Sequence, residues 1–573
     1  MEFILGPVKP NNSWKSITTG NYFLSYNLNS SIKERELVSE NVDYCLLGDV
    51  NVAFANLVQA EHQLSRVLKH IEKLTNGYLL FINKRENSIT LFTDIFGYYH
   101  IFSLQKGKEI YVSSDFKHLL DISDKKVDDY ALLDLVLFNY TLLDRTLISD
   151  IKRLKGGTEL VAGPEGFAMN VKYNFAENFV FSTESRSLKP AELGDILVDN
   201  LAQGISREHD IWLTMTGGFD SRALLAACNR LELNFSSFTF GQEGNIEMET
   251  PKSFINKYTK EHKNYFLDDS YLKRLPEIVG AFIDANLDNP TMLDIVQYSF
   301  IKEQSKPSNV IVGFMGGELM AGQSIGSQVT FTAFAAKLIT SYSKDELKIA
   351  FEAETELMGI LNQEHLAKLT DGYIDTLSTY LHEHQNMNLL RFLINEKYIK
   401  FFGAINKVFK HHSNLVIPFM NADYIRSLLY ADISFLRKKP FHQNPLQNFG
   451  YKSFYARMVK YLSPELGETK LDRLYKINDL CNPYRLPIAA AGYIKSHLFK
   501  LNKNKFPRPH HYDLWFREII IDELKESHPG LPDQDLILPQ ALNPDLYDQY
   551  SSLDKKRLAN AVSGLLAIKK IQN

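Results

Sequence analysis

Short apolar runs separated by turn residues dominate roughly the first 175 positions of the chain. Such runs occupy 44–47, 77–82 and 89–93, and the polar stretch 84–87 separates the last two. Runs of this length between turn signals are typical of β-strands. The pattern therefore predicts an N-terminal region built mainly from short strands.

From about position 185 the pattern changes to strands followed by helices. An apolar run at 211–215 leads through two glycines into a helical sequence, and a second strand-like run at 236–241 ends in glycine. A third run occupies 309–312, and most of the remaining sequence reads as helical. Strands that alternate with helices predict an open α/β sheet, in which ligands bind at the carboxyl ends of the strands.

The turn after the first of these strands carries the residues of a phosphate site. Gly217 and Gly218 permit close approach of a ligand, and the helix start presents free N–H groups to an anion. Thr216 and Ser221 add hydroxyl groups, and Asp220 has the oxygen chemistry that holds Mg²⁺. This spacing suits an enzyme that cleaves ATP between the α and β phosphates. The alternative interpretation is a tight turn that merely joins a strand to a helix.

Bulk properties restrict the class of protein. The chain has 573 residues, of which 45% are hydrophobic and 23% charged, as in ordinary globular proteins. A net charge of -4 argues against nucleic acid as a partner. The three cysteines have no metal-ligand or disulfide spacing, the start lacks a signal peptide, and no apolar run reaches the ~20 residues of a membrane helix. We therefore expect a cytoplasmic protein without membrane contact.

The sequence from Thr216 to Ser221 resembles the Ser-Gly-Gly-x-Asp-Ser nucleotide loop of the asparagine synthetase family. That family includes β-lactam synthetases and the macrolactam cyclases of lasso peptides. The resemblance implies ATP and Mg²⁺ as cofactors, an acyl-adenylate made from a carboxylate, and transfer of the acyl group to an amine.

The N-terminal region resembles the glutamine amidotransferase domain of the same family, through segments 93–102, 110–120 and 146–157. The resemblance implies an antiparallel β-sandwich over 1–175, followed by a synthetase domain over 185–573 with a parallel sheet and a helical C-terminal part. Working domains of this type use an N-terminal cysteine as nucleophile. Here position 2 is Glu2, and Cys45 lies in an apolar run typical of a buried cysteine. We expect a degenerate domain that cannot hydrolyse glutamine.

Several further site residues follow from the family resemblance. Segment 309–322 is similar to the family's Gly-Glu-Gly-x-Asp-Glu-Leu-Phe-Gly-Gly segment, and aligning it from Gly322 or from Gly313 leaves Glu318 as the single carboxylate. Glu318 is thus expected to bind a second Mg²⁺, opposite Asp220. The family's acceptor-side glutamate becomes Phe314 or Met315, which implies a substrate other than aspartate. The residues expected to contact nucleotide here are Leu213, Thr214, Phe240, Gly241 and Gly316.

In the family, a helix of the kind expected in the stretch 451–466 precedes a lysine. That lysine neutralises charge on the adenylate and tetrahedral oxygens. Lys470 is the closest positional match, and Lys452 is the second candidate. Solvated lysines without a catalytic role are the alternative for both.

Together these features predict an amide-forming ligase that adenylates a carboxylate and lacks its own glutaminase. An intramolecular amine would point to macrolactam formation or other natural-product biosynthesis, with a leader protease or carrier protein as a partner. Ammonia-dependent asparagine synthesis is one alternative. A non-catalytic binding protein that retains the fold is another.

Overall fold

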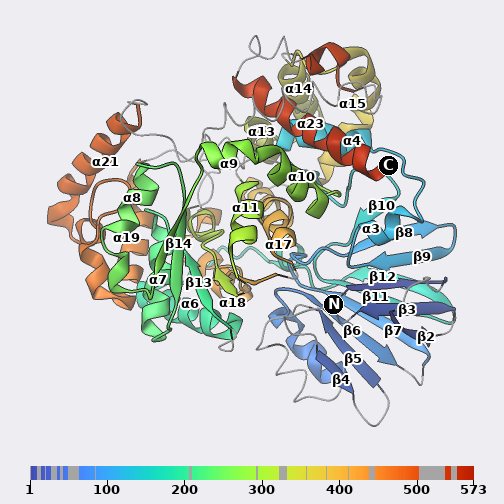
Figure 1. Cartoon of the computed structure of the whole chain (residues 1–573), viewed down its shortest axis with the longest axis horizontal. Helices are drawn as coiled ribbons and strands as arrows, with labels where there is room; N and C mark the ends of the chain where they lie inside the picture. The colour runs from blue at the N-terminus through green and yellow to red at the C-terminus, as the bar shows by residue number, and fades with distance from the viewer. Residues whose placement is uncertain are drawn as a thin grey trace.

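The computed structural model (Figure 1) describes most of the chain, with gaps. The described residues are 2–8, 14–19, 21–27, 35–38, 43–48, 54, 64–83, 86–205, 209–291, 295–306, 308–321, 332–356, 358–381, 384–410, 412–437, 445–501, 536–543 and 552–572. No helix among them is both long enough and apolar enough to cross a bilayer.

The N-terminal region folds into two six-stranded antiparallel sheets, which Figure 1 shows in blue and teal. The first sheet has the order β10-β8-β9-β1-β3-β2 and the second β12-β11-β7-β6-β5-β4. The strand bounds are β1 Glu2–Gly6, β2 Lys15–Thr19, β3 Tyr22–Asn27, β4 Arg35–Val38, β5 Asp43–Gly48, β6 Tyr78–Asn83, β7 Ser88–Thr93, β8 Phe102–Lys106, β9 Glu109–Ser113, β10 Ile151–Arg153, β11 Thr158–Gly163 and β12 Gly166–Val171. Cys45 lies on β5, as its apolar run predicts, but its side chain is outside the described residues.

Alternating apolar residues from both sheets form the core of this sandwich. Leu5 on β1, Leu24 on β3, Leu80 on β6 and Leu91 on β7 are all completely buried in one cluster. This inward alternation is the expected consequence of the two-residue period of a strand.

The turn after β7 is organised by a single carboxylate, that of Asp94. Its Oδ1 accepts hydrogen bonds from the main-chain N–H groups of Phe96 (3.1 Å), Gly97 (2.8 Å) and Tyr98 (3.0 Å), and its Oδ2 accepts one from Tyr99 (2.9 Å). Asp94 has no exposed surface. The aspartate in the 93–102 segment therefore has a structural role.

Replacing Asp94 with asparagine should lower the free energy of unfolding by roughly 2–4 kcal/mol. The amide offers one carbonyl oxygen and brings an NH₂ group against a buried N–H, so at least the Tyr99 N–H loses its acceptor. Chemical denaturation monitored by fluorescence measures the change. An Asp121→Asn variant, changed at an exposed aspartate, should unfold like the wild type; equal stability of both variants would contradict the assigned role.

The second region is built on a five-stranded parallel sheet with the order β15-β14-β13-β16-β17. Its strands are β13 Ile211–Thr214, β14 Ser236–Gly241, β15 His262–Phe266, β16 Asn309–Ile311 and β17 Asn414–Val416. The chain runs outward from β13 to β15 and then returns to the other side of β13 as β16. The carboxyl ends of β13 and β16 thus flank the point where the strand order reverses, which is where open α/β sheets bind ligands.

Helices surround this sheet and form most of the remaining structure (Figure 1). Their bounds are α2 Leu64–Val67, α3 Lys117–Leu120, α4 Asp129–Phe138, α5 Phe175–Asn178, α6 Pro190–Gly204, α7 Phe219–Arg230, α8 Ile246–Lys252, α9 Asp269–Lys273, α10 Leu275–Ala285, α11 Gln297–Gln304, α12 Gly316–Ala321, α13 Ala333–Thr340, α14 Lys344–Thr355, α15 Gln363–Leu377, α16 Gln385–Arg391, α17 Gly403–Phe409, α18 Ala422–Leu429, α19 Pro445–Leu462, α20 Ile477–Cys481, α21 Leu486–Leu501 and α23 Ser552–Gln572. A π-helical segment, η4 Phe392–Phe402, links α16 to α17.

Antiparallel sheets, a parallel sheet and many helices confirm the predicted mixed α/β fold class. The two regions meet over a polar seam. Arg153 of β10 donates to Asp288 at 2.8 Å, and Lys410 donates to the main-chain oxygen of Ser114 at 3.0 Å. The Tyr98 ring stacks on the Tyr398 ring with centroids 4.8 Å apart. The predicted domain limits, 1–175 and 185–573, remain a proposal.

Candidate functional site

The loop between β13 and α7 contains the predicted phosphate-binding residues. Thr216 Oγ1 accepts a hydrogen bond from the Gly218 N–H at 3.2 Å and lies 3.2 Å from Ser221 Oγ. The Thr216 N–H donates to the same Ser221 hydroxyl at 3.3 Å. These two hydroxyls therefore shape the loop by bonding within it. The start of α7, which has twelve residues, follows directly and presents its N–H groups to the same space.

Gly217 is required by a close main-chain contact. A Cβ atom at this position would lie 2.5 Å from the Cβ of Asp472, whose N–H donates to the Gly217 carbonyl at 3.1 Å. The segment around Asp472 therefore closes one side of the loop.

Arg222 anchors the loop from inside the protein, although sequence reasoning gave it no role. Its guanidinium donates to the carbonyl of Thr216 (3.2 Å), the hydroxyl of Thr469 (3.2 Å) and the carbonyl of Lys470 (2.5 Å). It also lies 4.3 Å from the centre of the Phe254 ring. The side chain is completely buried, and burial lowers its pKa to about 10, so it remains charged at neutral pH. The sequence signal that could have identified Arg222 was its position directly after Ser221 of the glycine loop.

Two carboxylates meet at the reversal point of the sheet. Asp220 lies in the first turn of α7, beyond the end of β13, and Glu318 lies on α12, beyond the end of β16. Burial, and secondarily the nearby charge of Glu318, raise the pKa of Asp220 to about 7. The Tyr455 hydroxyl of α19 donates to Asp220 Oδ1 at 2.7 Å. The expected pairing of Asp220 with Glu318 is thus present in the fold.

Gly316 is placed so that only glycine fits beside these groups. A Cβ atom there would lie 2.7 Å from Asp220 Oδ1 and 2.9 Å from the Tyr455 hydroxyl. Gly322, which supports one of the two alignments of this segment, lies outside the described residues.

A lysine that sequence reasoning missed neutralises Glu318. Lys397 Nζ lies 3.1 Å from Glu318 Oε1, and the lysine side chain is 1% exposed. It projects from the π-helical segment η4, a type of helix that is frequent at functional sites. The sequence carried no signal for this partner, because nearly eighty positions separate the two residues.

The residues present fit a magnesium ion. Glu318 lies close enough to Asp220 to contribute to the raised pKa of that carboxyl, and a divalent cation between two such carboxylates stabilises them. No group of three or more His, Cys, Asp or Glu residues able to hold a metal occurs in the described part of the chain. An ion on Asp220 and Glu318 would therefore complete its coordination with phosphate oxygens and water, as Mg²⁺ usually does.

The residues predicted to contact the nucleotide base occupy neighbouring strand ends. Phe240 and Gly241 end β14, which pairs with β13 through Thr214 and Phe238. The Thr214 hydroxyl donates to the Ile311 carbonyl at 3.1 Å, so it bridges β13 to β16. Leu213 is completely buried in the core, whereas Phe240 keeps part of its surface exposed. Their contact with a nucleotide remains a prediction.

An aromatic cluster surrounds Phe314, one of the two residues that can align with the family's acceptor-side glutamate. Phe314 stacks on Phe402 with ring centroids 4.4 Å apart, and it meets the edge of Tyr298 at 6.3 Å. Phe240 packs against the same tyrosine at 5.4 Å. Met315 is completely buried, with a left-handed φ of 68°. Phe314 and Met315 are the two residues that can align with the family's glutamate, and neither has a charged side chain or a hydrogen-bond donor.

The two candidate lysines differ in their surroundings. Lys470 has an exposed side chain, and its main-chain carbonyl is held by Arg222. Lys452 lies on α19 three residues before Tyr455, on the same helix face. It is half-buried 5.0 Å from the centre of the Tyr493 ring, and burial together with Arg473 lowers its pKa to about 8, against the pull of Asp472. Lys452 is thus the more enclosed of the two candidates, and a catalytic role for either lysine remains a prediction.

Comparison with known proteins agrees with this geometry. No family model matches the chain. Glutamine-hydrolysing asparagine synthetase 1 of Bacillus subtilis (strain 168) is 22% identical over 476 residues, which cover 78% of this chain and 71% of that protein. A putative glutamine-hydrolysing asparagine synthetase of Mycobacterium bovis is 24% identical over 244 residues, which cover 40% of this chain and 37% of that protein.

Among solved structures, glutamine phosphoribosylpyrophosphate amidotransferase of Bacillus subtilis aligns at a TM-score of 0.18 with 12% identity, over 37% of this chain and 54% of that one, which is too slight to carry an argument. The sequence similarity to the Bacillus synthetase extends over most of both proteins. This similarity supports membership of the asparagine synthetase family.

Proposed function

We propose that the protein is an ATP-dependent ligase that adenylates a substrate carboxylate and transfers the acyl group to an amine. The observation that carries the proposal is the pairing of Asp220 with Glu318 beside the glycine loop, at the reversal point of the parallel sheet. Carboxylates, loop N–H groups and a helix start at one place are suited to a polyphosphate with its metal.

The reaction has two steps. A carboxylate oxygen of the substrate attacks the α-phosphorus of ATP, and the bond to the β-phosphate oxygen breaks with release of pyrophosphate. The amine nitrogen then attacks the acyl carbon, and AMP leaves as the amine loses a proton. Residues 216–221 hold the departing pyrophosphate, and Lys452 supplies positive charge to the adenylate and the tetrahedral oxygens. Magnesium, held by Asp220 and Glu318, would offset phosphate charge.

The amine donor is ammonia or an amine on the substrate itself. Glu2 occupies the start of β1, where working amidotransferase domains of the family carry the nucleophilic cysteine. A carboxylate in this position cannot form the thioester on which glutamine hydrolysis depends.

We expect no release of ammonia from glutamine by the purified protein, because Glu2 stands where these domains carry their nucleophilic cysteine. Coupled detection of ammonia or glutamate measures the activity, and the glutaminase of an intact family member serves as the positive control. Glutamine turnover by the wild type that persists in a Cys45→Ala variant would reveal a different nucleophile and overturn the expectation.

The substrate we favour carries both a carboxylate and an amine, as in macrolactam or other natural-product formation. Support comes from Phe314, which brings an aromatic ring to the acceptor side where aspartate recognition would need a charged or polar group. A leader protease or a carrier protein would be the corresponding partner. Ammonia-dependent asparagine synthesis is the second candidate, because sequence similarity to asparagine synthetases favours it.

Binding and turnover experiments separate these candidates. Calorimetry with Mg-ATP should show saturable binding at one site, and pyrophosphate release should be unaffected by aspartate with ammonium. Release stimulated by aspartate would select asparagine synthesis. Failure to bind Mg-ATP would favour a non-catalytic protein that kept the fold. Peptides encoded beside the gene are the first substrates to test, with mass spectrometry to detect the loss of water on cyclisation.

A further inference from the structure

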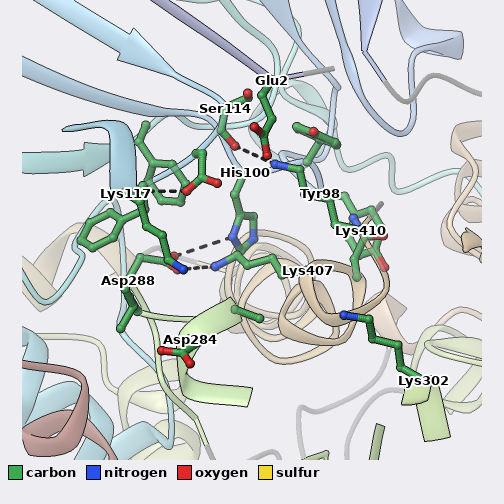
Figure 2. A pocket seen from close by; sticks show the side chains of 17 residues that line it. Glu2, Tyr98, His100, Ser114, Lys117, Asp284, Asp288, Lys302, Lys407 and Lys410 are labelled. Carbon is green, nitrogen blue, oxygen red and sulfur yellow. Dashed lines mark hydrogen bonds and ion pairs between the residues drawn. The ribbon is translucent and has the colours of Figure 1, made fainter. Parts of the chain in front are cut away.

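A pocket with a volume of about 230 Å³ lies in the seam between the N-terminal sandwich and the second region, which contains the parallel sheet and most of the helices. Figure 2 shows its lining, which includes Glu2, His100 and Ser114 from the sandwich and Lys302, Lys407 and Lys410 from the other side. None of its lining residues belongs to the glycine loop, to α12 or to α19. It is therefore a site separate from the one described above.

His100 is a buried polar group on the wall of this pocket, with a residue exposure of 5%. Its Nε2 lies 2.6 Å from the Ile399 carbonyl, so this nitrogen carries the ring proton. Its Nδ1 has no hydrogen-bond partner among the described residues, and lies 3.8 Å from Asp288 Oδ2. In a neutral imidazole whose Nε2 carries the proton, Nδ1 has no proton and can only accept a hydrogen bond. A buried acceptor without a donor is costly unless a ligand or water supplies one.

Two of the four acidic residues that line the pocket are neutralised by neighbouring cations, and the other two are Glu2 and Asp115. Asp288 is paired with Arg153 at 2.8 Å and with Lys407, and Asp284 is paired with Lys570 at 2.8 Å. Asp115 accepts the N–H of Lys117 at 3.0 Å. The carboxylates of Asp284 and Asp288 thus already have ion-pair partners.

The lysines around the pocket are in excess of the acidic partners. Within the described residues, Lys117, Lys302 and Lys410 have no carboxylate ion pair. Lys410 donates to the Ser114 carbonyl, and its Nζ lies 5.3 Å from the centre of the Tyr99 ring. Three ammonium groups on the lining of one small cavity attract an anion. Figure 2 shows Lys302 directed toward the pocket from one side of His100, and Lys410 directed toward Ser114 on the other side.

We propose that this seam pocket binds a small organic oxyanion, a carboxylate or a phosphate ester, that also carries a hydroxyl or ammonium group. The oxyanion lies on Lys302 and Lys410, and the donor group bonds to His100 Nδ1. This ligand site goes beyond the proposed ligase reaction, since it shares no residue with the nucleotide site. Because its walls come from both regions, the bound ligand also stabilises the seam.

The test is calorimetric titration of the full chain with citrate and, separately, with inorganic phosphate, at matched ionic strength. We expect one of them to bind with one-to-one stoichiometry and a Kd below about 1 mM. Citrate binding identifies a carboxylate site and phosphate binding a phosphate site. The Lys302→Met/Lys410→Met double variant should bind at least about tenfold more weakly. A Lys368→Met variant, changed at an exposed lysine on α15, should bind like the wild type.

Two further measurements keep the test decisive. The single Lys302→Met variant changes a side chain that makes no hydrogen bond or ion pair within the described residues, so it should fold normally and still weaken binding. Mg-ATP affinity should be the same in all of these variants, so a failure at this pocket is distinguishable from a failure of the ligase proposal. Absence of saturable binding of both probes, or equal affinity in the double variant, would overturn the proposal.

Discussion

Replacing Asp220 with asparagine should lower ATP-dependent pyrophosphate release by about a thousandfold or more, because the site then lacks one of its two magnesium carboxylates. The asparagine amide can still accept the Tyr455 hydroxyl, so the loop keeps its shape. Pyrophosphate release with a coupled enzyme measures the loss. An Asp195→Asn variant, changed at an exposed residue on α6, should retain full activity.

The same variant should be at least as stable as the wild type in the absence of nucleotide. Burial and Glu318 raise the pKa of Asp220 from 3.8 to about 7. A carboxyl whose pKa is higher in the folded state loses its favourable contribution as pH rises through that value. Asparagine removes the ionised group, so the melting temperature should rise most above pH 7. A variant that was both inactive and strongly destabilised would indicate a structural role for Asp220 instead.

Replacing Lys452 with methionine should reduce kcat by roughly a hundredfold to a thousandfold, whereas Lys470→Met should leave it nearly unchanged. Lys452 is half-buried on the helix face that carries Tyr455, while Lys470 reaches into solvent. Single-turnover kinetics with saturating ATP measure the chemical step directly. A loss of activity confined to Lys470→Met would show that the sequence alignment, and not the position on α19, identifies the catalytic cation.

A pH profile adds an independent readout for Lys452. Burial lowers its pKa to about 8, so the charged form decreases as pH rises beyond that value. Wild-type kcat should therefore fall above about pH 8, and the residual activity of Lys452→Met should lack this step. A wild-type profile that stays flat up to pH 10 would exclude the lysine from the reaction.

The fold class and the position of the nucleotide loop were predictable because both depend on local patterns. Short apolar runs and glycine turns specify strands, and the change at β13 specifies an α/β sheet. Glu318 was found because a glycine-rich segment after a strand is also a local signal. In contrast, Lys397, Tyr455 and Arg222 act through contacts over long sequence separations or from inside the core. No periodicity marks such residues, since their partners are brought together by the packing of α19 and η4.

The choice between Lys452 and Lys470 also depends on packing that sequence patterns do not report. Spacing along the chain pointed to Lys470, but spacing does not report which side of a helix or turn faces the loop. That information comes from α19, whose packing directs Tyr455 to Asp220 and carries Lys452 with it.

The two acidic residues of the site follow β13 and β16, which pair directly although β14 and β15 lie between them in the sequence. Neither half of the carboxylate pair has its partner before these two strands have paired. A cation held by both carboxylates would therefore also link the ends of the two strands, and its binding would report that this part of the sheet is complete.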